Sequence, residues 1–235
     1  MPHCQLYLIS PLDVSGQFPD QLAHALEAGP VAAFQFRVKG LGEHAAAELA
    51  KPLQDICAAK EVAFIVNDSV SLVKRIDADG VHLGQQDGDL REARERLGKA
   101  AQIGVTCHGS RHLALEAAEA GADYVAFGAF YPTTTKRVSH AAKPALLRWW
   151  HVWAELPSVA IGGITLDNAV PLIEAGADFL AVSAGVWQHP GGPEAAVAAF
   201  GKLVTEHRSF DPRAADLAAI MEELGEPELG MPGEG

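Results

Sequence analysis

Short apolar runs and helical patterns alternate along almost the whole chain, and this alternation limits the folds that it can adopt. Eight runs rich in apolar and β-branched residues lie at 5–9, 33–38, 62–66, 80–83, 102–105, 124–127, 158–161 and 179–182. Helical patterns lie at 19–27, 43–59, 70–76, 90–97, 111–120, 144–154, 167–175 and 193–205. Because strands that alternate with helices form parallel βαβ units, the sequence predicts an α/β fold of eight such units.

A weak internal repeat supports this count. The segments DADGVHLGQ (77–85), AGADYVAFG (120–128) and AGADFLAVS (175–183) each end a helix and begin a strand. Gly and Asp suit the turn at that point, so we interpret them as structural residues. An open doubly wound sheet is the competing architecture, but no G-x-G-x-x-G follows the first strand. We therefore predict a closed (β/α)8 TIM barrel, a single domain over residues 1–207.

Charge and composition argue against several classes of function. The 235 residues carry a formal net charge of −12, which opposes binding of nucleic acid through a broad basic surface. No apolar run approaches the roughly 20 residues that span a bilayer, and the first residues lack the pattern of a secretion signal. The three cysteines, Cys4, Cys57 and Cys107, are far apart, so neither a disulfide framework nor a zinc site is indicated. We expect a cytoplasmic protein with reduced thiols that binds neither nucleic acid nor membrane.

Residues 208–235 form an acidic C-terminal tail, with seven acidic residues against two arginines. Asp211 is a candidate N-cap and Pro212 a candidate first residue of a short helix that Gly225 would end. Its apolar stripe would consist of Leu217, Ile220, Met221 and Leu224. We expect the last ten residues, 226–235, to be disordered.

In a TIM barrel the chemistry lies at the carboxyl ends of the strands, so polar residues there are informative. The second apolar run reads FQFRVKG, in which Gln35, Arg37 and Lys39 alternate with apolar residues and share one face of a strand. If that face is the barrel interior, two unpaired cations there would be costly, which implies a bound anion. The alternative is a solvent-facing or salt-bridged rim of the strand.

Two carboxylates follow neighbouring runs. Asn67 and Asp68 come after the third run and Asp87 after the fourth. Taken alone, Asp68 could cap the next helix and Asp87 could be an ordinary turn residue. Together they make a hard-oxygen site of the type that Mg²⁺ prefers when substrate phosphates complete its shell. We favour the metal site over two coincidental caps.

The later strand ends offer hydroxyls, a cation and glycines. Thr106 and His108 follow the fifth run, although either could be an ordinary polar residue. The loop after the sixth run reads PTTTK at 132–136, and its hydroxyl and ammonium groups suit a phosphate-binding loop. The alternative is an ordinary solvated loop. Gly162 and Gly163 after the seventh run permit close backbone approach at the recurrent phosphate site of this fold, or serve tight packing alone. Three tryptophans at 149, 150 and 153 are assigned to packing or to an oligomer surface.

With these motifs in place, the chain resembles the thiamine phosphate synthase family from about Leu6 through Leu203. The motifs are Q-x-R-x-K at 35–39, N-D at 67–68, H-L-G-Q-x-D at 82–87, P-T-x-T-K at 132–136 and I-G-G-I at 161–164. They stand in the family's order and at its strand ends. Any one of these motifs would be weak evidence, but the set is specific.

The resemblance implies an Mg²⁺-dependent transferase. Such an enzyme joins 4-amino-2-methyl-5-hydroxymethylpyrimidine diphosphate to 4-methyl-5-(2-phosphoethyl)thiazole and releases diphosphate and thiamine phosphate. By the same resemblance Asp68 and Asp87 would hold Mg²⁺, and Arg37, Lys39 and Lys136 would be the catalytic cations. The pyrimidine diphosphate would be held by Gln35, Arg37, Lys39, Asn67, Thr106 and Lys136. The thiazole phosphate would be held by Thr133, Thr135, Gly163, Val182 and Ser183.

The sequence departs from the family pattern in three places. Val38 stands where the family usually has Glu, so the orienting role of that carboxylate must be absent or replaced here. Thr106 stands where the family usually has Ser, which keeps the hydroxyl. The acidic tail lies outside the resemblance.

Two rival functions remain open at this stage. A thiazole tautomerase of the same superfamily would use His108 as an acid–base, but it has no diphosphate to hold, so retained Asp68, Asp87 and Lys136 argue against it. A non-catalytic phosphate-binding barrel is the rival from another class. The sequence is also compatible with a homo-oligomer.

Overall fold

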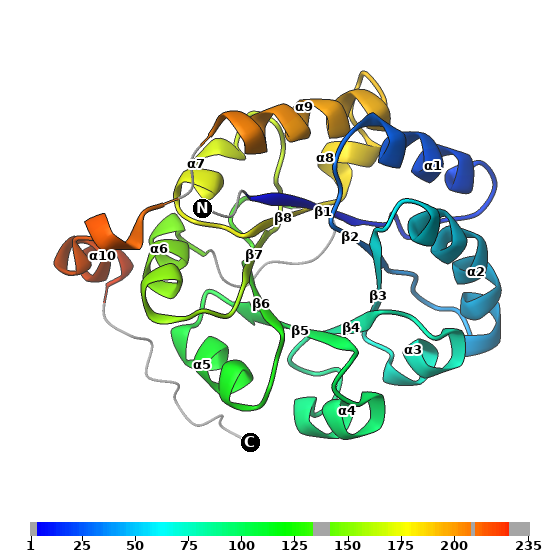
Figure 1. Cartoon of the computed structure of the whole chain (residues 1–235), viewed down its shortest axis with the longest axis horizontal. Coiled ribbons are helices and arrows are strands. Elements are labelled where there is room, and N and C mark those ends of the chain that lie inside the picture. Colours follow the sequence, from blue (N-terminus) through cyan, green and yellow to red (C-terminus); the bar gives the residue numbers. More distant parts are fainter. Residues whose placement is uncertain (1–3, 134–141, 208–209, 226–235) are drawn as a thin grey trace.

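The computed structural model describes residues 4–133, 142–207 and 210–225, and in them the chain forms a closed parallel barrel in the order β1-β2-β3-β4-β5-β6-β7-β8 (Figure 1). The helices surround the barrel on the outside. The prediction of a (β/α)8 barrel is confirmed. Because all strands run parallel, their carboxyl ends meet at one rim of the barrel.

The strands are β1 (Gln5–Ile9), β2 (Ala33–Phe36), β3 (Ala63–Asn67), β4 (Gly80–Leu83), β5 (Gln102–His108), β6 (Tyr124–Gly128), β7 (Ser158–Ile161) and β8 (Phe179–Val182). The helices are α1 (Phe18–Ala28), α2 (Glu43–Ala59), α3 (Val70–Ile76), α4 (Leu90–Leu97), α5 (Arg111–Glu119), α6 (Pro144–Trp153), α7 (Val170–Glu174), α8 (Ala184–Trp187), α9 (Pro193–Glu206) and α10 (Leu217–Leu224), with a 3-10 turn, η1 (Pro212–Ala214), between α9 and α10.

Most predicted bounds agree with the structure, and the differences have local causes. The second strand ends at Phe36, two residues earlier than predicted, because the backbone N–H of Arg37 donates to the Ser10 hydroxyl, 2.9 Å away, instead of to a strand carbonyl. Helix α7 is shorter than predicted, and α8 was not predicted because four residues are too few to show a helical period.

Two apolar layers hold the barrel together. Outward-facing strand residues such as Phe34, Phe64 and Phe127 pack against the helices, while the interior is filled by a smaller cluster that includes Tyr7, Ile65 and Tyr124. Residues on both faces of each strand are therefore buried, as expected of a parallel barrel covered by helices.

The internal repeat has a structural role, as the sequence indicated. In each copy an aspartate accepts a hydrogen bond from a backbone N–H on the preceding strand: Asp79 from Phe64, Asp123 from Ile103 and Asp178 from Ser158, at 2.7, 2.6 and 2.8 Å. The N–H of the same aspartate donates to the carbonyl of the same strand residue. The repeat thus fastens β4, β6 and β8 to the strands before them at the rim where the strands begin.

The tail differs from the prediction in one respect. Asp211 caps η1 and Pro212 begins it, but the helix does not continue from there, because α10 begins after its own N-cap, Asp216. Helix α10 lies beside α6 (Figure 1), where the backbone carbonyl of Glu223 accepts from Lys143 at 2.8 Å and its carboxylate pairs with Arg148. Gly225 ends the helix as predicted. The predicted disorder at 226–235 falls outside the described residues.

The three cysteines and two of the three tryptophans at 149–153 are buried. Cys4, Cys57 and Cys107 are unpaired and buried, and burial raises the pKa of each thiol to about 12. Trp149 and Trp150 are buried, while Trp153 is 64% exposed. Within the described ranges, no helix has the length and apolar character needed to cross a membrane.

Candidate active site

The end of β2 brings two predicted residues to the carboxyl rim of the barrel. Gln35 lies inside the barrel, 3% exposed, and its amide nitrogen donates to the Tyr7 hydroxyl at 2.9 Å. Arg37 is half-buried just beyond the strand. Among the described residues, no carboxylate lies within ion-pair distance of its guanidinium. The predicted shared face does not extend to Lys39, which lies on the exposed loop after β2 because the strand has already ended.

Ser10 is a residue of this rim that sequence reasoning missed. Its side chain is buried, accepts from the backbone N–H of Arg37 at 2.9 Å and donates to the Arg37 carbonyl at 3.3 Å. Its own carbonyl accepts from the Ser183 hydroxyl at 3.4 Å. Ser10 therefore joins the ends of β1, β2 and β8, and a serine directly after an apolar strand is the only signal that could have pointed to it.

Asp68 follows the end of β3 in a left-handed backbone conformation, with φ of 66°. Its backbone N–H donates to the carbonyl of His82 on β4 at 2.9 Å. Its carboxylate pairs with the ammonium group of Lys39. Asn67, the last residue of β3, is half-buried beside it. The structure thus brings Lys39, Asn67 and Asp68 together, as the site predicted from sequence requires.

Asp87 lies in the loop after β4, and its carboxylate interacts with that of Asp68. Partial burial raises the pKa of Asp87, and a hydrogen bond and charge repulsion from Asp68 raise that pKa further. The Asp87 carboxylate also accepts from the Gly84 N–H at 2.9 Å, and a Cβ on Gly84 would lie 2.6 Å from that carboxylate, so a larger residue there would displace it.

Other residues cap the helices that follow the two aspartates. The N-cap of α3 is Ser69, whose hydroxyl accepts from the N–H of Leu72, and the N-cap of α4 is Asp89. Asp68 is therefore not a helix cap, while Asp87 does serve its turn through Gly84. Its nearness to Asp68 is not required by that turn.

This pair fits a hard divalent cation. Carboxylate oxygens are the ligands that Mg²⁺ prefers, and a cation between two carboxylates would relieve the repulsion that raises the Asp87 pKa. In the part of the chain that the structure describes, no group of three or more His, Cys, Asp or Glu residues could hold a metal. Two protein ligands suit Mg²⁺ when substrate phosphates supply others.

Thr106 and His108 lie at the end of β5, both half-buried. The Thr106 hydroxyl is 2.8 Å from Nε2 of His82, which lies inside the barrel on β4. The pairing of β5 with β6 shifts register between Thr106 and His108, and His108 has a positive φ of 51°. This irregularity interrupts the regular strand pairing at the rim.

The loop after β6 is only partly described. Thr133 is half-buried. Thr135 and Lys136, which complete the predicted phosphate-binding loop, lie outside the described residues. Gly163 has φ of 65°, and a Cβ on it would lie 2.4 Å from the carbonyl oxygen of Pro132. Gly163 therefore allows tight packing between the loops after β6 and β7, which is the alternative use of this glycine that the sequence left open.

At the end of β8, Val182 presents its main chain and not its side chain to the rim. Val182 is 1% exposed with its side chain in the outer apolar layer, so a ligand at the rim could meet only its main chain. Ser183 is half-buried and directly precedes the short helix α8, and Trp187 of that helix donates to the Ile9 carbonyl at 2.6 Å.

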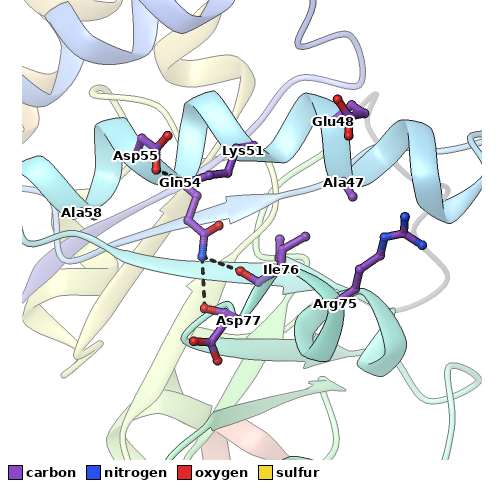
Figure 2. Close-up of a pocket in the computed structure, with 9 residues that line it drawn as sticks. All are labelled: Ala47, Glu48, Lys51, Gln54, Asp55, Ala58, Arg75, Ile76 and Asp77. Atoms are coloured by element: carbon purple, nitrogen blue, oxygen red, sulfur yellow. Dashed lines mark hydrogen bonds and ion pairs between the residues drawn. The ribbon is translucent and has the colours of Figure 1, made fainter.

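A surface hollow of about 540 Å³ lies elsewhere, between α2 and α3 (Figure 2). The amide nitrogen of Gln54 crosses it to the carbonyls of Ile76 and Asp77, each at 3.1 Å, and Lys51 pairs with Asp55 on its edge. The bonds from Gln54 satisfy carbonyls at the C-terminal end of α3. They lie in the outer layer of helices, away from the carboxyl ends of the strands. The hollow holds none of the predicted site residues.

Comparison with known proteins identifies the family of this chain. A family model described as thiamine monophosphate synthase matches residues 6–186. The thiamine-phosphate synthase of Erythrobacter litoralis is 65% identical over 204 residues, 85% of this chain and 95% of that protein. That of Rhodospirillum centenum is 52% identical over 205 residues, 87% of this chain and 99% of that protein. The solved structure of thiamine phosphate pyrophosphorylase from Pyrococcus furiosus has a TM-score of 0.77 at 31% identity and covers 86% of this chain and 96% of that one.

The fold and the rim residues define a (β/α)8-barrel enzyme whose polar site lies at the carboxyl ends of its strands. Lys39, Asp68 and Asp87 lie together on the rim formed by the first half of that barrel, and Arg37 follows β2 on the same rim. The chain belongs to the thiamine monophosphate synthase family.

Proposed function

We propose that this protein is a thiamine-phosphate synthase. It joins 4-amino-2-methyl-5-hydroxymethylpyrimidine diphosphate to 4-methyl-5-(2-phosphoethyl)thiazole and forms thiamine phosphate and diphosphate. The observation that carries the proposal is the group formed by Asp68, Asp87 and Lys39 at the ends of β2, β3 and β4, in a chain 65% identical to a thiamine-phosphate synthase.

The reaction needs no protein nucleophile. The bond between the pyrimidine methylene carbon and the diphosphate oxygen breaks, and diphosphate leaves with the electron pair. The amino-substituted ring stabilises the resulting cation until the lone pair of the thiazole nitrogen forms the new C–N bond. The protein therefore has to stabilise the leaving diphosphate, exclude water and align the second substrate.

The diphosphate would lie against the cations of the β2 and β6 loops. Arg37 is a half-buried residue, and its guanidinium suits a phosphate because it can bind two oxygens at once. Lys39 lies beside Asp68. A diphosphate at this position would contact both the Lys39 ammonium group and a metal held by Asp68. Lys136 would supply a third positive charge. Their charges offset negative charge that grows on the leaving group in the transition state.

Mg²⁺ would be held by Asp68 and Asp87. When bound, it supplies charge neutralisation and orientation of the leaving diphosphate. Asn67, next to Asp68, would complete the pyrimidine diphosphate site together with Gln35 and Thr106 inside the rim.

The thiazole phosphate would lie at the ends of β7 and β8. The loops after these strands and the start of a short extra helix form the recurrent phosphate site of TIM barrels, and α8 occupies that position here. Gly163, Val182 and Ser183 would offer main-chain N–H groups, and Thr133 and Thr135 would offer hydroxyls. This division puts the two substrates on opposite sides of one rim, with the β6 loop between them.

Val38 stands in place of the family's usual Glu, and the structure gives it an apolar role. Its side chain is half-buried against the core. Arg37 therefore has no carboxylate from its neighbour to orient it. The reciprocal bonds of its backbone with Ser10 fix the start of this loop instead.

One comparison of two activities tests the proposal against the tautomerase. The purified full chain is given either both coupling substrates with Mg²⁺ or the thiazole tautomer alone. We expect coupling and no isomerisation, and we expect coupling to stop with excess chelator. Isomerisation of the tautomer without coupling would overturn the proposal in favour of a tautomerase, and neither activity would favour a non-catalytic barrel.

A further inference from the structure

Five polar side chains inside the barrel form one continuous chain of hydrogen bonds below the rim. Gln35 donates to the Tyr7 hydroxyl at 2.9 Å, which lies 3.0 Å from the Tyr124 hydroxyl. The Tyr124 hydroxyl lies 3.1 Å from Nδ1 of His82, and Nε2 of His82 lies 2.8 Å from the Thr106 hydroxyl. These residues come from five different strands. We call them the polar relay, and its two ends are residues of the candidate site.

The relay is deeply buried and closely packed. Tyr7 and Gln35 are each 3% exposed, His82 is 5% exposed and Tyr124 is 8% exposed. The rings of His82 and Tyr124 stack with centroids 5.6 Å apart, and the ring of Tyr124 fills the space that a side chain on Gly104 would need. Buried polar groups must be paired to avoid a large desolvation cost, so each bond in such a chain constrains the next.

The amide orientation of Gln35 sets the direction of the relay, because its nitrogen faces the Tyr7 hydroxyl. The Tyr7 hydroxyl receives a bond from the amide nitrogen of Gln35, so its single proton goes to Tyr124, whose own proton then goes to Nδ1 of His82. A neutral imidazole that accepts at Nδ1 carries its proton on Nε2 and donates it to Thr106. Burial raises the pKa of Tyr7 to about 12 and that of Tyr124 well above its usual value, so both hydroxyls keep their protons at neutral pH.

This direction determines what the two ends can offer. Gln35 uses an amide N–H inside the relay and keeps its oxygen as an acceptor, while Thr106 receives a bond and keeps its own proton to donate. An aminopyrimidine has the matching pattern, because its amino group donates and the adjacent ring nitrogen accepts. An oxopyrimidine has the reverse pattern, since its oxygen accepts and its ring N–H donates.

We propose that the polar relay sets the hydrogen-bond polarity of the pyrimidine subsite, so that the enzyme selects the 4-amino ring over its 4-oxo analogue. Tyr7, Tyr124 and His82 are then positioning residues that act through Gln35 and Thr106. The inference rests on the proposed function, which places the pyrimidine between these two ends.

The test uses the full chain with Mg²⁺ and measures recognition of the ring rather than turnover alone. The readouts are KM for the aminopyrimidine diphosphate, KM for the thiazole phosphate, and the inhibition constant of the 4-oxopyrimidine diphosphate. Tyr124→Phe keeps the ring over Gly104 and removes the central hydroxyl. We expect it to raise KM for the aminopyrimidine diphosphate about fivefold to tenfold, the scale of one or two hydrogen bonds. The preference for the amino over the oxo ring should fall by a similar factor, with KM for the thiazole phosphate unchanged.

Matched variants show whether an effect comes from the lost hydrogen bond or from altered packing. His82→Gln carries an amide nitrogen that can replace Nε2 as the donor to Thr106, so it should keep more of the preference for the amino ring than His82→Leu does. Ser158→Ala removes another buried hydroxyl, which bonds to Asp178 at the opposite end of the barrel, and should leave all three readouts unchanged. Tyr7→Phe interrupts the next bond of the relay and serves if Tyr124→Phe does not fold.

Two results would overturn the relay. One is an unchanged preference for the amino ring in folded Tyr124→Phe and Tyr7→Phe, and the other is an equal rise of KM for both substrates. Failure of the proposed function is seen separately, as the absence of coupling by the wild-type protein. Normal wild-type coupling with an unchanged preference in the variants therefore contradicts the relay alone.

Discussion

The carboxylates of Asp68 and Asp87 interact with each other although they lie in the loops after two different strands, β3 and β4. Two negative charges this close repel, and the consequence is the raised pKa of Asp87. Lys39 offsets part of that charge from the side of Asp68. We expect a bound divalent cation to relieve the remaining repulsion.

This pair predicts how Mg²⁺ binding depends on pH. Ionised carboxylates are needed to hold the metal, and the proton on Asp87 is lost only above its raised pKa. We therefore expect Mg²⁺ affinity to fall on acidification at a higher pH than an ordinary aspartate would dictate. Calorimetric Mg²⁺ titrations from neutral to mildly acidic pH measure this, and an affinity that stays constant down to the usual aspartate range would contradict it.

Replacing Asp87 by Asn should separate function from stability. The amide oxygen can still accept from Gly84, and the repulsion with Asp68 disappears, so the folded protein should be at least as stable. Coupling should fall about a hundredfold, the scale of losing one electrostatic contact to the leaving group. Asp89→Asn, which changes the helix cap in the same loop, is the control and should keep its activity. Equal activity in the two variants would contradict the metal assignment.

The fold was predictable from the sequence because its signals are local. Alternating apolar runs located all eight strands, and the aspartates of the repeat gave their turns. Asp68 and Asp87 could be paired from sequence because strand ends of a parallel barrel converge. The link from His82 to Thr106 through the interior could not be predicted, since it depends on barrel register. Ser10 was missed because its partner Arg37 lies 27 residues away and contributes only main chain.

Gly104 should not tolerate a methyl group. A Cβ there would lie 1.9 Å from the Tyr124 ring, and that ring is buried in the cluster inside the barrel. We expect Gly104→Ala to lower the free energy of unfolding by about 1–3 kcal/mol or to prevent folding, as overpacking does. Gly42→Ala is the control, because nothing lies within 4 Å of its Cβ and its φ is −67°, and it should change stability by less than about 0.5 kcal/mol. Urea unfolding of both variants measures the difference.

Removal of the tail after His207 should affect stability more than catalysis. None of the proposed ligands lies beyond Ser183, so kcat and both KM values should stay nearly unchanged. Ile220 is buried and Glu223 bonds to α6, so the truncated protein should lose about 2 kcal/mol of stability. A truncated chain that folds but does not catalyse coupling would show that the tail closes the site.

The loop 132–136 should distinguish the two substrates. Lys136→Ala should mainly lower kcat, because its charge acts on the leaving diphosphate in the transition state. Thr133→Ala should mainly raise KM for the thiazole phosphate, because a phosphate contact made equally in ground and transition states changes KM more than kcat. Steady-state kinetics with each substrate varied in turn separates these effects. Normal coupling by Lys136→Ala would overturn the assignment of this loop, and loss of activity in His108→Ala alone would favour the tautomerase.

The central claim is tested most directly by the stoichiometry of the products. The purified full chain is mixed with the pyrimidine diphosphate, the thiazole phosphate and Mg²⁺, and the phosphorus resonances are followed by NMR. The account predicts that thiamine phosphate and diphosphate appear in equal amounts and that leaving out the thiazole phosphate or Mg²⁺ abolishes thiamine phosphate formation. The account would be contradicted if no thiamine phosphate formed in the complete mixture, or if it formed at an undiminished rate in excess chelator.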